Sequence, residues 1–81
     1  MDTNTAIHET LSKGLAAYEQ QQYEEALKLL LPIAEAGNPE AQFRVGGIYD
    51  GGYGVQQDEE TACTWYKKAA AQGHTLALAY H

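Results

Sequence analysis

A repeat of 36 residues constrains the fold of this chain more than any other feature of its sequence. Residues 26–37 align with residues 62–73 at this constant offset, without a gap. After each segment the chain restarts in a similar way, at residues 38–41 and at residues 74–77. A period of about 20–50 residues is typical of stacked supersecondary units, each of which buries its apolar face on the next. The chain therefore contains two units and the start of a third.

Hydrophobic periodicity predicts that each unit is a pair of α-helices. Residues 3–20 carry apolar side chains at spacings of four, four and three, which is typical of a helix with one buried side. Residues 23–36 show a similar pattern, and Gly37 is suited to end that helix because glycine adopts positive φ freely. Asn38 and Asp58 are favourable N-caps for two further helices. No useful stretch alternates with a period of two, so strands are not expected.

These elements predict an all-α fold, a short right-handed stack of αα-hairpins with about two repeats and a partial fifth helix. The 81 residues are expected to form one domain, since chains of this length lie at the low end of the single-domain range. Repeat one is expected at about residues 5–37, repeat two at about 38–73, and the start of a third unit at 74–81.

The second unit resembles a known repeat family. It matches the family pattern at residues 37–49, 52–55, 58, 62 and 65–73. This pattern is similar to the Sel1-like repeat (SLR), a relative of the tetratricopeptide repeat with a longer glycine-rich loop between its paired helices. Residues 23–37 are similar to the half-repeat that often opens such arrays. Gln21 stands where the tetratricopeptide turn usually has glycine, so the resemblance predicts a tight or strained turn there.

The resemblance implies a non-enzymatic module that binds other proteins, as a scaffold or adaptor does. In tetratricopeptide-type hairpins the first helix of each pair lines a concave groove, which suits a peptide or helix. Carried onto this sequence, the groove residues are His8, Leu11, Leu15, Tyr18 and Glu19 in the first unit and Glu40, Phe43, Gly47 and Asp50 in the second. These side chains mix apolar and acidic groups. The implied partner therefore carries apolar and basic side chains.

No motif in the sequence indicates catalysis, a cofactor or a metal. The glycine-rich loop at residues 50–57 lacks the dinucleotide fingerprint and the P-loop motif, and the acids at residues 58–60 would repel a phosphate. These acids also lack the spacing of an EF-hand calcium loop. The three histidines are scattered, and Cys63 has no partner signal that would make it a nucleophile. We expect no catalytic residue, no cofactor and no metal site.

A net charge of −6 disfavours nucleic acid and anionic membranes as partners, because both bind clustered lysines and arginines. The single cysteine excludes an internal disulfide, and the sequence shows neither a signal peptide nor an apolar run long enough to span a bilayer. We expect a cytoplasmic chain, although export of a longer parent chain stays open. The acidity also leaves open an inhibitor or immunity-type protein that covers a basic partner. A further alternative is a small hydrolase or nucleotide-binding enzyme that acts with a second chain.

The C-terminal end of the chain is a second candidate interaction surface. Residues 74–81 include Leu76, Leu78 and Tyr80 but no acidic residue, lysine or arginine, and Leu78 stands where the family pattern has glutamine. A helix this short is not stable alone, and an uncapped apolar end of a repeat stack is a docking surface. We expect either self-association through this end or a continuation of the array.

Overall fold

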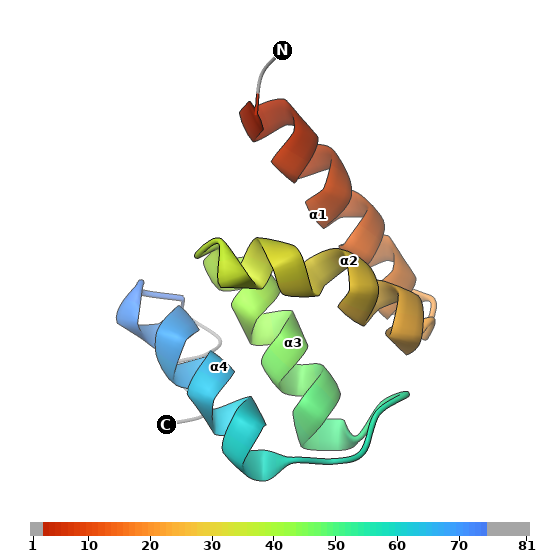
Figure 1. Ribbon diagram of the computed structural model, residues 1–81, viewed down its shortest axis with the longest axis vertical. Helices are drawn as coiled ribbons and strands as arrows, with labels where there is room; N and C mark the ends of the chain where they lie inside the picture. The colour runs from red at the N-terminus through yellow and green to blue at the C-terminus, as the bar shows by residue number, and fades with distance from the viewer. Residues whose placement is uncertain (1–2, 75–81) are drawn as a thin grey trace.

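The computed structural model describes residues 3–74, which form four α-helices in two hairpins. The helices are α1 (Thr3–Glu19), α2 (Tyr23–Glu35), α3 (Pro39–Gly51) and α4 (Glu59–Ala71). α1 packs along α2, α3 packs along α4, and α2 also lies against α3 (Figure 1). No strand occurs among the described residues, and the all-α prediction is confirmed. The predicted fifth helix, with Leu76, Leu78 and Tyr80, lies outside them.

Short polar side chains begin α3 and α4, as the sequence predicts. Asn38 Oδ1 accepts a hydrogen bond from the Ala41 N–H at 2.9 Å, and Asp58 Oδ1 accepts one from the Thr61 N–H at 3.1 Å. Each bond satisfies an N–H group that the first turn of a helix leaves without an intrahelical partner. Gly37 follows the end of α2 with a φ of 109°, the positive value expected there. Local chemistry therefore sets the starts of both helices of the second hairpin and the end of α2.

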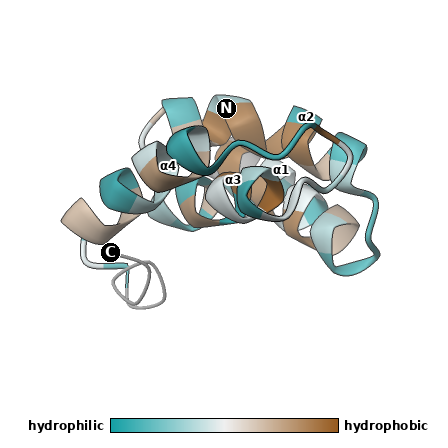
Figure 2. Ribbon diagram, turned by 90° about the horizontal axis from the view of Figure 1, so that it is seen from below, coloured by the Kyte–Doolittle hydropathy of each residue, from teal (hydrophilic) through white to brown (hydrophobic). Residues whose placement is uncertain are grey.

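The hydrophobic core lies along α2 and between the two hairpins. Its largest fully buried side chains are Leu30, Val45 and Ile48, and buried alanines of all four helices complete it. In the ribbon of Figure 2, stretches coloured as hydrophobic occur on both α1 and α2. Val55, from the loop between α3 and α4, packs against this core, as the family resemblance implies. The long loop is therefore held to the body of the protein and leads the chain directly into α4.

Equivalent glycines bring the paired helices of each repeat into contact. A Cβ added to Gly14 of α1 would lie 2.5 Å from Leu30 Cδ2, and one added to Gly46 of α3 would lie 2.9 Å from the Tyr66 ring. Leu30 and Tyr66 are 36 residues apart, whereas Gly14 and Gly46 are 32 apart. The turn between α3 and α4 is four residues longer than the turn between α1 and α2, which accounts for the difference. The two hairpins share one packing arrangement despite their different turns.

The turn between α1 and α2 is strained at Gln21, which has a φ of 64°. A residue with a Cβ pays about 1–2 kcal/mol in this left-handed region, whereas glycine pays none but loses more freedom on folding. We expect Gln21→Gly to raise the free energy of unfolding by about 0.5–1 kcal/mol, measured by urea denaturation. Gln20→Gly is the matched control, because Gln20 lies outside the left-handed region. An equal gain at both positions would show that Gln21 is not strained.

Candidate functional site

Four side chains join the first helices of the two repeats on one surface. We call Tyr18, Glu40, Phe43 and Arg44 the α1/α3 face. The guanidinium carbon of Arg44 lies 5.2 Å from the ring centroid of Tyr18 and 5.4 Å from that of Phe43. Both distances are within the range of a cation–π interaction. Arg44 therefore links a tyrosine of α1 to a phenylalanine of α3.

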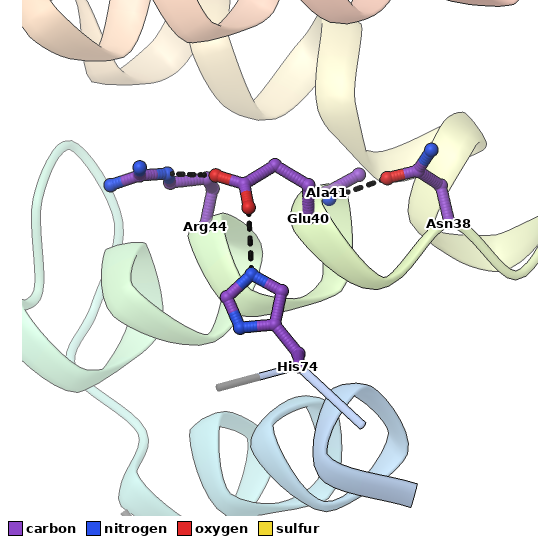
Figure 3. Close-up of polar contacts among 5 residues, drawn as sticks. All are labelled: Asn38, Glu40, Ala41, Arg44 and His74. Atoms are coloured by element: carbon purple, nitrogen blue, oxygen red, sulfur yellow. Dashed lines mark hydrogen bonds and ion pairs between the residues drawn. The ribbon is translucent and has the colours of Figure 1, made fainter. Parts of the chain in front are cut away.

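Glu40 is the polar centre of the α1/α3 face (Figure 3). The Arg44 Nε–H donates to Glu40 Oε1 at 2.9 Å, and His74 Nε2 lies 2.7 Å from Glu40 Oε2. The His74 ring also stacks on Phe43, with centroids 4.8 Å apart and an interplanar angle of 20°. His74 lies three residues beyond the end of α4. The face therefore runs continuously from the end of α1, across α3, to the segment that follows α4.

These contacts change the acidity of Glu40. Partial burial alone would raise the pKa of its carboxyl group, but the hydrogen bonds with His74 and Arg44 and their charges outweigh burial, and its pKa lies below the ordinary value of 4.5. A lowered pKa in the folded state stabilises the fold above the unfolded pKa, and this stability is lost as pH falls through the folded value. Glu40 is therefore a negatively charged, paired group at neutral pH.

We expect Glu40→Gln to lower the free energy of unfolding at pH 6 by up to about 1 kcal/mol, since the carboxylate is partly exposed and screened by solvent. The difference from the unmodified protein should shrink as pH falls through the lowered pKa of the Glu40 carboxyl group. Urea denaturation at pH 6 and at an acidic pH measures this difference. Glu35→Gln, at an exposed position of α2, is the control and should change stability little at either pH. A deficit that persists at low pH would contradict the ionic role of Glu40.

Tyr18 is the aromatic contribution of α1 to the face. Burial raises the pKa of its hydroxyl above 10.0, and the nearby Arg44 charge opposes this only in part. The hydroxyl lies 3.2 Å from the position that a Cβ of Gly47 would occupy, so the absence of a side chain at Gly47 makes room for it. Tyr18 also packs edge-to-face on Tyr23 of α2, with ring centroids 5.5 Å apart. Its ring is thus held in place from both hairpins.

The structure brings only part of the predicted groove together. Tyr18, Glu40 and Phe43 meet through Arg44, and the Tyr18 hydroxyl lies beside Gly47. Leu11 and Leu15 are half-buried and pack against the core, while His8 and Glu19 are exposed on α1. Asp50 instead accepts a hydrogen bond from the Tyr66 hydroxyl of α4, at 3.4 Å.

The sequence reasoning missed Arg44 and did not place His74 in the site. Glu40 and Arg44 are four residues apart on one helix, and this spacing of opposite charges is the signal that could have identified Arg44. Nothing in the local sequence points to the contact of His74 with α3, because that contact spans 34 residues.

Comparison with known proteins assigns the chain to a family. The family description "Sel1 repeat" matches residues 9–38 and 39–74, which together cover most of the chain. The chain belongs to the Sel1-repeat family. The chitin synthase regulator SKT5 of Saccharomyces cerevisiae is 43% identical to it over 62 residues, which make up 76% of this chain and 9% of that protein. No solved structure matches this Sel1-repeat chain significantly.

Sel1 repeats are generally protein-interaction modules and are typically non-catalytic. Among residues 3–74 of this Sel1-repeat chain, no three histidine, cysteine, aspartate or glutamate side chains gather as a metal site would require. Within the same part of the chain, no helix combines the length and the apolar character needed to cross a membrane.

A buried amide, that of Gln42, connects the two repeats. Gln42, which is 4% exposed, donates from Nε2 to the Ala34 carbonyl at 3.0 Å. Its Oε1 accepts from Gln72 Nε2 at 3.0 Å, and Gln72 Nε2 also lies 2.7 Å from the Gly37 carbonyl. These bonds connect Gln42, in α3, to the end of α2 on one side and to Gln72, at the end of α4, on the other. Gln42 therefore fixes the second repeat on the first.

Proposed function

We propose that this Sel1-repeat chain is a protein-interaction module whose α1/α3 face binds a peptide or helix of another protein. The observation that carries the proposal is the link from Tyr18 through Arg44 to Phe43, which makes one surface from two repeats. Tyrosine and arginine are enriched among the residues that dominate binding energy in protein interfaces. Tyr18, Phe43 and Arg44 are all half-buried, so their orientation is set before a partner arrives.

The charges of the face define the partner more closely. Glu40 already accepts a hydrogen bond from Arg44 and lies 2.7 Å from His74 Nε2. The Arg44 guanidinium lies over the rings of Tyr18 and Phe43. Apolar side chains of the partner would cover these rings. Basic side chains would meet Glu19, the exposed acid at the end of α1. This matches a helix or peptide with apolar anchors and flanking basic residues, the mode in which an amphipathic segment lies in a groove.

The relative in yeast supports a regulatory version of this proposal. Its name describes a regulator of an enzyme, which suits a protein that acts by binding another protein. We propose an analogous adaptor or regulatory role for this chain, with the bound protein supplying any chemistry. Because the chain spans only 9% of that relative, the activity of the whole relative is not part of the proposal. Self-association through Leu76, Leu78 and Tyr80 stays a prediction.

A random dodecapeptide phage library selected on the immobilised chain tests the face. We expect Phe43→Ala and Arg44→Gln each to raise the Kd of a selected synthetic peptide about tenfold or more, since central anchors typically cost over 1.4 kcal/mol when removed. Thr64→Ala and Lys67→Ala change exposed residues of α4 and should leave the Kd unchanged. Circular dichroism of each variant verifies folding. Unchanged Kd values for folded Phe43→Ala and Arg44→Gln would refute binding at this face.

The same peptides separate this function from that of an acidic inhibitor. The chain has a net charge of −6, and α2 and α4 both carry acids in their first turns. An acidic inhibitor would bind at a rate that falls steeply with salt, whereas binding at the α1/α3 face should depend on salt only moderately.

A further inference from the structure

Arg44 carries hydrogen-bond donors that the fold does not use. A guanidinium group has five N–H donors and no acceptor. The Nε–H of Arg44 donates to Glu40 Oε1 at 2.9 Å, and hydrogen bonding with Arg44 also counteracts part of the rise in the pKa of the Tyr18 hydroxyl. Most of the N–H groups of Nη1 and Nη2 have no acceptor among residues 3–74. Figure 3 shows these two nitrogens on the side of the guanidinium that lies away from Glu40.

The guanidinium group of Arg44 is held in place but is still accessible. Its carbon lies 5.2 Å from the ring centroid of Tyr18 and 5.4 Å from that of Phe43, and the Glu40 carboxylate fixes one edge. The Arg44 side chain is nevertheless 30% exposed, so water can reach its unused donors in the free chain. Arg44 is therefore a preorganised donor group at the centre of the α1/α3 face.

A partner that covers the two rings must also cover Arg44, because the guanidinium lies over both of them. Its Nη donors would then lose their access to water, which is costly unless the partner supplies acceptors. The backbone carbonyls of a helical partner are already used within its own helix, so the acceptor has to come from a side chain. A carboxylate suits Arg44 best, since it accepts two parallel hydrogen bonds and balances the charge.

The acids of the chain itself do not fill this role. Glu40 receives the Nε–H of Arg44 through one oxygen, and its other oxygen lies 2.7 Å from His74 Nε2. Glu19 is exposed at the end of α1, and no item of contact joins it to Arg44 among the ion pairs of residues 3–74. The acceptor for the Nη groups is therefore expected from outside the chain.

We propose that the partner of the α1/α3 face carries an aspartate or glutamate between its apolar anchors, and that its carboxylate accepts hydrogen bonds from the Nη groups of Arg44. This inference rests on the proposed function and names a side chain that the bound segment needs. Because the chain has a net charge of −6, acids elsewhere in the partner would be repelled. An acid opposite Arg44 would thus select one register of the bound segment, with the basic residues of the partner outside it.

A peptide selected from the phage library supplies the probe. It is synthesised with an acetylated N-terminus and an amidated C-terminus, so that any carboxylate comes from a side chain. Each aspartate is changed to asparagine and each glutamate to glutamine, one at a time, and isothermal titration calorimetry measures the Kd. The chains tested are the unmodified chain, Arg44→Gln and the control Lys67→Gln, which removes a positive charge from an exposed position of α4. Circular dichroism verifies the folding of both variants.

We expect one acid-to-amide change in the peptide to raise the Kd about tenfold for the unmodified chain and for Lys67→Gln. The same change should alter the Kd for Arg44→Gln less than about twofold, because the carboxylate has then lost its partner. The proposal is overturned if selected peptides contain no acid, if no acid-to-amide change weakens binding to the unmodified chain, or if the change weakens binding to Arg44→Gln equally. A Kd that Phe43→Ala still raises would, in each of these cases, leave binding at the α1/α3 face intact. Unchanged Kd values for Phe43→Ala and Arg44→Gln would overturn both proposals.

Discussion

Gly46→Ala should lower the free energy of unfolding by about 2 kcal/mol, although alanine favours a helix by about 1 kcal/mol over glycine. The added Cβ would lie 2.9 Å from two carbons of the Tyr66 ring and 3.2 Å from the Ala62 carbonyl oxygen. Tyr66 is 6% exposed, so its ring has little room to move, and α3 and α4 would have to separate. For a domain of this size, the loss is a large part of the total stability. Urea denaturation followed by circular dichroism measures it.

Gly47→Ala is the matched control for Gly46→Ala. Among the atoms of residues 3–74, its Cβ would meet only two hydroxyl oxygens, that of Tyr18 at 3.2 Å and that of Tyr66 at 3.8 Å. The Tyr18 hydroxyl is the end of a half-buried side chain and can shift by a few tenths of an ångström. We expect the two glycines to differ by about 1.5 kcal/mol or more, with Gly47→Ala near neutral. Equal effects at both positions would mean that the α3–α4 contact does not depend on the missing side chain of Gly46.

Gln42→Ala should lower the free energy of unfolding by about 2–3 kcal/mol. It removes one buried and one partly buried hydrogen bond and leaves a space where the Gln42 side chain lay. A buried polar group that loses its hydrogen-bond partner, here the Ala34 carbonyl, costs about 1–3 kcal/mol, and the lost packing of the Gln42 side chain adds to this. The measurement is urea denaturation, with an unchanged far-ultraviolet spectrum to show that the helices remain. A loss below about 0.5 kcal/mol would be within the range of ordinary surface changes and would contradict the bridging role.

Gln72→Ala completes a double-mutant cycle with Gln42→Ala. Gln72 is exposed and touches Gln42 and the Gly37 carbonyl, so its removal alone should cost about 1 kcal/mol or less. The two changes together should cost less than their sum, because each removes the same contact between the amides. Strict additivity would show that the contact at 3.0 Å contributes nothing.

Much of the fold could be predicted from the sequence because the decisive signals are local. The side chains of Asn38 and Asp58 bind N–H groups three residues away, and Gly37 ends α2 with its own backbone conformation. The strain at Gln21 could also be expected, since the repeat pattern prefers glycine at that turn. The offset of 36 residues then paired the helices, because equivalent residues in a repeat make equivalent contacts.

The site was predicted less completely because it depends on contacts between distant residues. The groove residues were assigned by repeat register, which places them on a helix face but does not show their partners. Arg44 reaches Tyr18 across 26 residues and His74 reaches Glu40 across 34, and neither distance leaves a local pattern. Glu40 consequently forms an ion pair with Arg44 and a contact with His74. Its position in α3 alone did not indicate these partners.

The measurement that tests the central proposal most directly is a titration of the ¹⁵N-labelled chain with a selected peptide, followed by NMR. Binding at the α1/α3 face should shift the amide signals of Tyr18, Phe43 and Arg44 and leave those of Lys67 and Lys68 in place. Residues 59–63 of α4 should also stay unshifted, since they lie outside the α1/α3 face. Shifts confined to α4, or to the exposed acids at the starts of α2 and α4, would contradict the proposal that the first helices of the two repeats form the binding surface.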